Sequence, residues 1–74
     1  MEIINDTFLY IKRHYTGGYV LIKFDDILSI EDNDDEYNRS SKISYKCLDK
    51  INICYVKHSV KEIKDFLQKY IKNN

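Results

Sequence analysis

The side chains best suited to chemistry are the carboxylates of the acidic segment Glu31-Asp32-Asn33-Asp34-Asp35-Glu36. Asp32, Asp34 and Glu36 alternate as calcium ligands do in an EF-hand loop. The rest of that motif is missing, because the sixth position is not glycine and the twelfth is Ile43, where a bidentate glutamate is required. We therefore predict no metal site and interpret the segment as a solvated loop or as a docking patch for a basic partner protein.

Zinc-binding and catalytic motifs are not found in the sequence either. Cys47, Cys54, His14 and His58 are suitable ligand types for zinc, but their spacing matches no zinc motif. No nucleophile lies beside a base, and Gly17-Gly18 belongs to no GxGxxG or Walker pattern. We expect a protein that is not an enzyme and that holds no cofactor.

The two cysteines are expected to stay reduced. A two-residue turn at Asp49-Lys50 would pair Cys47 with Asn52 and Tyr45 with Cys54, so the thiols would not face each other. They are also too few for a disulfide-rich secreted scaffold, and no secretory leader opens the chain. These observations predict a cytoplasmic location, in a bacterial cell or in an infected host cell.

Tyrosine is abundant, with seven residues among 74. Tyrosine combines a large rigid contact area with a polar tip, so it suits both a small core and an interface anchor. Together with the acidic segment, the tyrosines on predicted strands form our predicted partner-binding set: Tyr10, Tyr19, Tyr45, Tyr55, Asp32, Asp34, Asp35 and Glu36.

Charge is unevenly distributed although the formal net charge is zero. The stretch from Asp25 to Glu36 contains no basic residue, whereas the stretch from Lys42 to Asn74 contains eight lysines. The basic residues that alternate with aromatic residues on predicted strands are Lys12, Arg13, Lys23, Lys46 and Lys57. That mixture can stack single-stranded nucleic acid, which gives an alternative function. A neutral chain lacks the basic excess that drives phosphate binding, so nucleic acid is not the favoured partner.

Turn residues at Gly17-Gly18, Asp25-Asp26 and Asp49-Lys50 divide the chain into strand-like segments. We predict strands at 7–15, 19–24, 27–31, 42–48 and 51–57 and a helix at 60–72, within one domain covering 1–74. The predicted fold class is α+β, with a small antiparallel five-stranded curved sheet or half-barrel and one C-terminal amphipathic helix.

The helix has the clearest pattern. We expect Ser59 and Glu62 to form a capping box at its start. The Ser59 hydroxyl can accept a hydrogen bond from a backbone N–H of the first turn, and the Glu62 side chain can reach back to the backbone N–H of Ser59. Its apolar residues fall on one side: Val60, Ile63, Phe66, Leu67, Tyr70 and Ile71.

Several strands carry apolar residues on both faces, for example Ile51, Ile53 and Tyr55 on one face and Cys54 and Val56 on the other. A helix about 10 Å wide covers roughly half of one face of a five-stranded sheet. We therefore expect the sheet to curl around its own interior and a second molecule to cover the remainder.

The stretch Val20-x-Ile22-x-x-Asp25-Asp26-Ile27-Leu28-x-Ile30-Glu31, followed by a hairpin and Val56-Lys57-x-Ser59-Val60-Lys61-Glu62-Ile63, resembles the small flagellar FlbD/SwrD-like proteins. More distantly, it resembles one half of the LytTR DNA-binding domain. The resemblance implies a small accessory protein without chemistry of its own.

The predicted function is that of a non-enzymatic protein-binding module, which acts as an inhibitor or adaptor by occupying a partner protein surface. Ile, Lys, Asn and Tyr supply 34 of the 74 residues, a bias typical of A/T-rich codons, so we expect a gene from an A/T-rich bacterium, a phage or a mobile element. Because so small a chain buries little surface, we also expect a homo-oligomer. The longest apolar run is too short to span a membrane.

Overall fold

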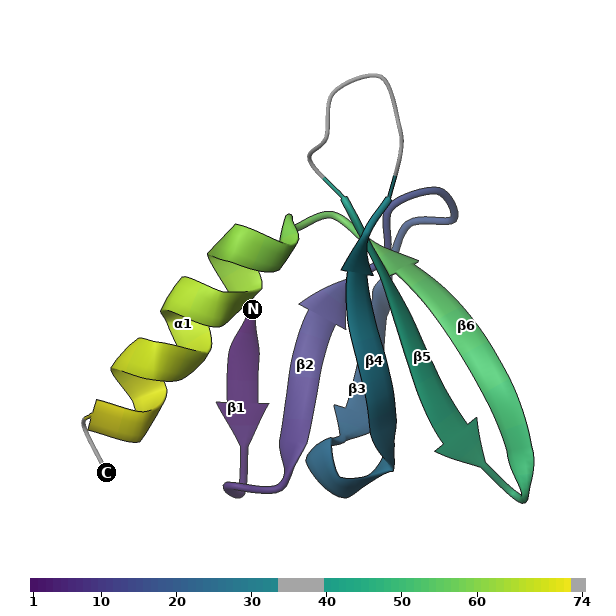
Figure 1. Cartoon of the computed structure of the whole chain (residues 1–74), viewed down its shortest axis with the longest axis horizontal. Coiled ribbons are helices and arrows are strands. Elements are labelled where there is room, and N and C mark those ends of the chain that lie inside the picture. The colour runs from purple at the N-terminus through teal and green to yellow at the C-terminus, as the bar shows by residue number, and fades with distance from the viewer. Residues whose placement is uncertain (34–39, 73–74) are drawn as a thin grey trace.

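The computed structural model describes residues 1–33 and 40–72 and shows two antiparallel sheets and one helix (Figure 1). The elements are β1 (Glu2–Ile4), β2 (Phe8–Lys12), β3 (Tyr19–Lys23), the short 3-10 helix η1 (Phe24–Asp26), β4 (Ile27–Asp32), β5 (Ser41–Cys47), β6 (Lys50–Val56) and α1 (Val60–Lys72).

The N-terminal sheet has the order β1-β2-β3. The turn between β1 and β2 places Asn5 and Asp6 at positive φ, which these residue types tolerate better than most. Between β2 and β3, Gly17 and Gly18 have φ values of 72° and 69°, as expected for a glycine-dependent hairpin loop. The loop is closed by a hydrogen bond of 2.9 Å from the Arg13 N–H to the Gly18 carbonyl.

The C-terminal sheet has the order β4-β5-β6. Its β5–β6 register differs from our prediction, because Cys47 pairs with Lys50 and Cys54 pairs with Ile43. The turn therefore consists of Leu48 and Asp49, both at positive φ, and not of Asp49-Lys50. A shift of two residues leaves every side chain on its predicted face, which is why the hydrophobic pattern could not exclude it. Both cysteines are free.

The prediction of one five-stranded sheet is wrong, because the strands form two separate three-stranded sheets. The sequence reading missed β1, whose three residues are too few to show a period. It also treated Asp25-Asp26 as a corner within one sheet. In the structure η1 redirects the chain there, so β4 pairs with β5 and begins a second sheet.

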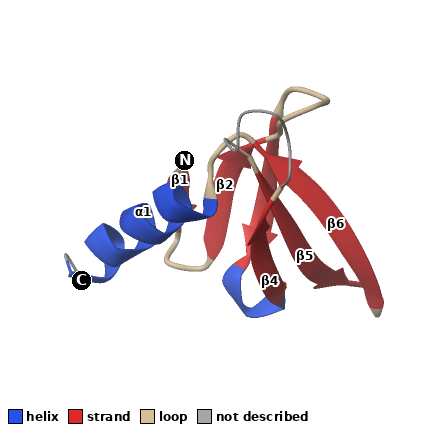
Figure 2. Cartoon of the chain, turned by 45° about the horizontal axis from the view of Figure 1, so that its top comes forward, coloured by secondary structure: helices blue, strands red, loops and turns tan. Residues whose placement is uncertain are grey.

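Within the described residues, backbone pairing between the two sheets is limited to one bridge, in which Arg13, just beyond β2, pairs with Val56 at the end of β6. Hydrogen bonds run there from the His14 N–H to the Tyr55 carbonyl (2.9 Å) and from the Lys57 N–H to the Lys12 carbonyl (3.0 Å). The sheets are joined at this corner and separate away from it, as Figure 2 shows.

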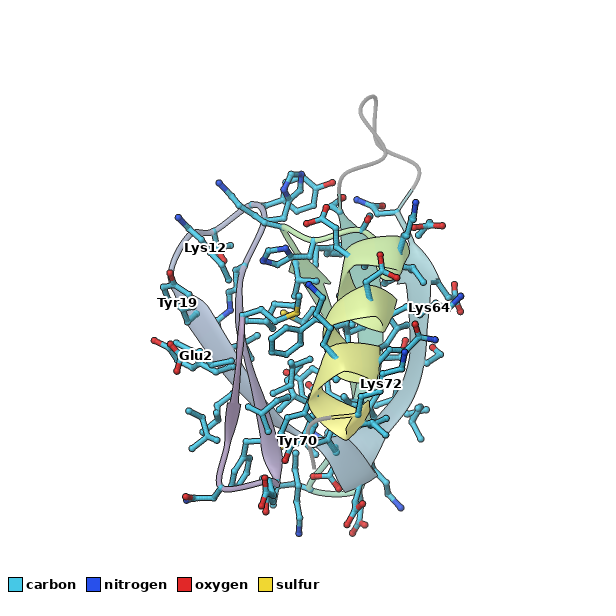
Figure 3. All side chains as sticks on the ribbon, turned by 90° about the vertical axis from the view of Figure 1, so that its left-hand side faces the viewer. Glu2, Lys12, Tyr19, Lys64, Tyr70 and Lys72 are labelled. Carbon is cyan, nitrogen blue, oxygen red and sulfur yellow. The ribbon has the colours of Figure 1, made fainter. Side chains whose placement is uncertain are left out.

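One hydrophobic core fills the space between the sheets and the helix. Its members come from both sheets and from α1: Leu9, Ile11, Val20, Ile22, Ile43, Cys54, Val56 and Ile63. The inner faces of the sheets therefore shield each other, and the helix lies across the opening between them, while labelled residues such as Lys12 and Tyr19 point outward (Figure 3). Phe66 and Leu67 are half-buried against this core, whereas Ile71 at the helix end is exposed.

Candidate protein-binding surface

Large exposed apolar side chains gather on the outer face of β6. Ile51 is 70% exposed, Ile53 53% and Tyr55 37%, and because they alternate along the strand they point to the same side. Tyr15 contacts Tyr55 edge to face, with ring centroids 5.5 Å apart. We call Tyr15, Ile51, Ile53 and Tyr55 the β6 surface. It extends over most of the length of the strand.

The backbone of β6 is also partly accessible, because β6 is an edge strand of its sheet. At the C-terminal end of β6, the Tyr55 carbonyl and the N–H of Lys57, just beyond the strand, form hydrogen bonds with the chain that follows β2. In an antiparallel strand every second residue directs both its N–H and its C=O to the same side of the strand. Because Tyr55 directs these groups away from β5, Ile53 and Ile51 direct their N–H and C=O groups away from β5 too. Among the residues that the structure describes, no strand pairs with β6 on that side between Lys50 and Cys54.

A pocket of about 220 Å³ lies beside this free edge, where the chain after β2 diverges from β6. It is lined by Arg13, Tyr15, Thr16, Ile53, Cys54 and Tyr55. Burial raises the pKa of the Cys54 thiol, and the neighbouring Arg13 guanidinium only partly opposes this effect. Cys54 is therefore held as a neutral thiol that packs in the wall of the pocket, and it is unsuited to act as a nucleophile.

The four predicted interface tyrosines do not form one surface. Tyr10 and Tyr19 stack on the outer face of the N-terminal sheet, with centroids 4.7 Å apart and planes 3° from parallel. Tyr45 is half-buried and packs against the core. Tyr55 alone of the four belongs to the β6 surface.

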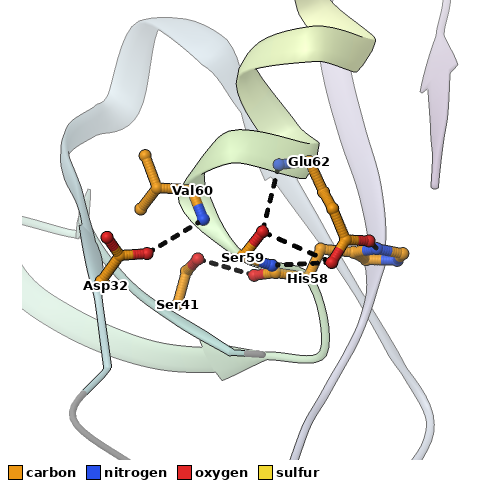
Figure 4. A network of polar contacts seen from close by, with 6 residues as sticks. All are labelled: Asp32, Ser41, His58, Ser59, Val60 and Glu62. Atoms are coloured by element: carbon orange, nitrogen blue, oxygen red, sulfur yellow. Dashed lines mark hydrogen bonds and ion pairs between the residues drawn. The ribbon is translucent and has the colours of Figure 1, made fainter. Parts of the chain in front are cut away.

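Asp32 takes part in the start of the helix, as Figure 4 shows. Its carboxylate accepts a hydrogen bond of 3.3 Å from the Val60 N–H, so Asp32 acts as a second cap for α1 beside Ser59. Ser41, in β5 next to Asp32, donates from its hydroxyl to the His58 carbonyl at 2.6 Å. The other predicted acids, Asp34, Asp35 and Glu36, lie outside the described residues.

The capping box itself is confirmed. The Glu62 N–H donates to the Ser59 hydroxyl at 3.2 Å, and the Ser59 N–H donates to the Glu62 carboxylate at 3.4 Å. The His58 ring also lies 3.0 Å from that carboxylate. The hydrogen bond with His58, followed by the one with the Ser59 backbone, lowers the pKa of Glu62. These contacts fix the direction in which α1 leaves β6.

The described part of the chain contains neither a cluster of metal-ligating side chains nor a helix that could span a membrane. Within residues 1–33 and 40–72, no three His, Cys, Asp or Glu side chains gather closely enough to hold a metal ion. In the same residues, no helix has both the length and the apolar character needed to cross a bilayer.

Sequence reasoning missed the β6 surface as a site, although it noted that Ile51, Ile53 and Tyr55 share a face. The pattern of β6 is apolar on both sides, so it does not tell which face is buried. The face that carries Cys54 and Val56 is the buried one because these two side chains pack in the core with residues of the N-terminal sheet and of α1. A contact so distant in sequence gives no local signal.

The fold thus defines a small α+β domain with a partly unpaired sheet edge. No known protein family matches the sequence, and no match was found among curated proteins or among solved structures. The resemblance to FlbD/SwrD-like and LytTR proteins therefore stays a prediction.

Proposed function

We propose that this chain is a non-enzymatic protein-binding module that docks a partner protein on the β6 surface. The observation that supports this proposal best is the row of exposed apolar side chains on the outer face of an edge strand, next to a pocket. Exposed apolar residues that form a contiguous row, as opposed to single ones, mark interaction sites in many proteins. Occupying a partner surface would suffice for an inhibitor or an adaptor.

The chemistry of the surface favours an apolar partner with a few polar groups. Tyr15 and Tyr55 supply aromatic anchors of the kind enriched in binding hot spots. Tyr15 is held in place, since its hydroxyl accepts a hydrogen bond of 2.9 Å from the Asn33 side-chain amide. An anchor that is fixed before binding loses less entropy on association.

A nucleic-acid function is the second candidate, for one reason. Lys42 and Lys46 on β5 lie directly across from Tyr55 and Ile51, so basic and aromatic groups share the outer face. Glu31 lies 3.9 Å from Lys42 and offsets part of that positive charge. Partner capture that weakens linearly with the logarithm of salt concentration would favour this candidate, whereas an apolar interface persists at high salt.

Immobilised protein exposed to a lysate of the source cell tests the proposal. We expect the wild type to retain a defined protein at high salt and the variant Ile51→Lys with Ile53→Lys to lose it. Leu21→Lys is the matched control, because Leu21 is an equally exposed apolar residue on the outer face of the other sheet. Equal retention by the double variant, or loss with Leu21→Lys alone, would contradict docking on the β6 surface.

A further inference from the structure

We propose that the pocket beside the free edge of β6 binds a carboxylate, and that its occupant is an aspartate or glutamate side chain of the partner protein. This inference rests on the proposed function, because it names the chemical group that the partner brings to one end of the β6 surface. The carboxylate would bind to the guanidinium of Arg13, which lines the pocket.

Arg13 supplies the only charge among the described residues that line the pocket, since the other five are tyrosine, threonine, isoleucine and cysteine side chains. Within residues 1–33 and 40–72, no carboxylate lies within ion-pair distance of it, and the ion pairs found there join Lys42 to Glu31 and His58 to Glu62. A guanidinium stays charged at any pH at which the chain is folded. A half-buried arginine without a carboxylate beside it is therefore suited to take up an anion.

The Arg13 side chain is held on two sides. On one side the guanidinium interacts with the Cys54 thiol, where burial raises the pKa of the thiol and the positive charge partly opposes the rise. On the other side Nη1 reaches the base of the β2–β3 loop, 3.9 Å from where a side-chain carbon at Gly18 would lie. The backbone is fixed as well, by the bridge to Val56 and by the hydrogen bond to the Gly18 carbonyl. A cation that is fixed before binding loses little entropy when it takes up a ligand.

Hydrogen-bond donors face the same pocket. Ile53 lines it and directs its N–H away from β5, and no described residue accepts a hydrogen bond from that N–H. Thr16 adds a hydroxyl to the wall. A carboxylate accepts several hydrogen bonds through two oxygens, so one oxygen can bind the guanidinium while the other accepts from the Ile53 N–H or the Thr16 hydroxyl.

The size and the apolar part of the pocket favour a side chain as the occupant. Its volume of about 220 Å³ is below the roughly 300–1,000 Å³ of sites that enclose a whole small-molecule ligand. The rings of Tyr15 and Tyr55 can pack against the aliphatic stem of an aspartate or glutamate. Since the pocket lies at the Tyr55 end of the β6 surface, a protein seated on Ile51 and Ile53 can place an acidic residue there.

Phosphate is the competing anion, because arginine binds phosphate as well as carboxylate. Proteins that bind a nucleic-acid backbone neutralise several phosphates with several cations. This pocket offers one cation among the described residues, between tyrosine rings and other uncharged side chains. Such a setting suits a singly charged carboxylate better than a chain of phosphates.

An NMR titration of the backbone amides with N-acetyl-glutamate N-methylamide tests the inference, because this probe carries one side-chain carboxylate and no free terminus. At constant ionic strength we expect saturable shifts at Ile53, Tyr55 and the Arg13 Nε. The corresponding glutamine compound has nearly the same shape without the charge and should cause no saturable shift there. N-acetyl-glutamine, with its charge on the α-carboxylate, and inorganic phosphate complete the comparison. Tighter binding of either one than of the glutamate probe would overturn the assignment to an acidic side chain.

Two substitutions locate the binding site. Arg13→Gln removes the charge and keeps a polar side chain, so we expect it to weaken binding of the glutamate probe by about tenfold or more. Lys12→Gln is the matched control, because Lys12 is an exposed cation one position earlier that does not line the pocket. It should change binding by less than about twofold.

Unchanged signals from core amides such as Ile63 show that each variant is folded. If Arg13→Gln does not fold, the comparison of the glutamate and glutamine probes on the wild type decides the outcome, since it needs no substitution. Equal weakening by the two substitutions, or equal shifts by the two probes, would overturn the inference.

The two proposals can fail separately. If Arg13→Gln captures the partner protein as well as the wild type does, and Ile51→Lys with Ile53→Lys does not, docking on the β6 surface stands and the carboxylate inference fails. If the wild type captures no protein but binds the glutamate probe through Arg13, the pocket is a carboxylate site and the proposed function fails.

Discussion

β4 and β6 are the two edges of one sheet, yet they are protected very differently. β4 carries a bulge between Ile27 and Ser29, ends in two acids and lies beside α1. β6 has no charge between Ile51 and Val56 and no helix over its outer face. Since such features protect an edge from pairing with other strands, the β6 edge is the less protected of the two.

The largest expected effect concerns the helix that protects β4. Ile63 is 2% exposed in the core, so Ile63→Ala should lower the free energy of unfolding by about 2–5 kcal/mol through lost burial and a cavity. The same change at Ile53 should alter it by no more than about 0.5 kcal/mol, because Ile53 is exposed in the isolated chain. Urea unfolding at a protein concentration where the chain is monomeric measures both. Similar losses at the two sites would remove the contrast between the edges.

A smaller effect is expected at the helix start. Ser59→Ala removes the acceptor of the Glu62 N–H and should cost about 1 kcal/mol. Ser44→Ala, on the outer face of β5, makes a suitable control and should be near neutral. If thermal unfolding shows no difference between the two variants, the Asp32 carboxylate is sufficient to hold the helix start by itself.

The smallest effect is a pH dependence. The pKa of Glu62 is lowered from its ordinary value of 4.5 in the folded chain, so its contribution to stability is present above that value and is lost as pH falls through the lower folded pKa. We expect Glu62→Gln to lower the Tm at pH 7 and the difference from wild type to shrink as the solution becomes more acidic than pH 4.5. A difference that stays constant would assign the effect of the substitution to packing.

Local sequence signals located the helix start and the glycine hairpin because each depends on residues a few positions apart. Ser59 and Glu62 lie within one turn, and Gly17 and Gly18 adopt the positive φ that their type permits. The way in which the two sheets meet depends on distant contacts such as that of Arg13 with Val56, which no local pattern encodes. That is why the single curved sheet was wrong while the helix cap was right.

The predicted binding residues lie in different parts of the fold, for a similar reason. Residue type identified tyrosine as a suitable anchor, but only the fold decides that Tyr45 faces the core and Tyr55 faces outward. Asp32 was grouped with the acidic segment because of its neighbours in sequence, whereas its carboxylate bonds to Val60, 28 residues away. The sequence indicates which residue types suit binding, but it does not show where the fold places them.

The hairpin tip formed by Leu48 and Asp49 has a consequence for how this chain could be altered. Both residues sit at positive φ, where asparagine and glycine are favoured and a leucine is strained by about 1 kcal/mol. Exchanging them through Leu48→Asn and Asp49→Gly should therefore make the lone molecule more resistant to heat.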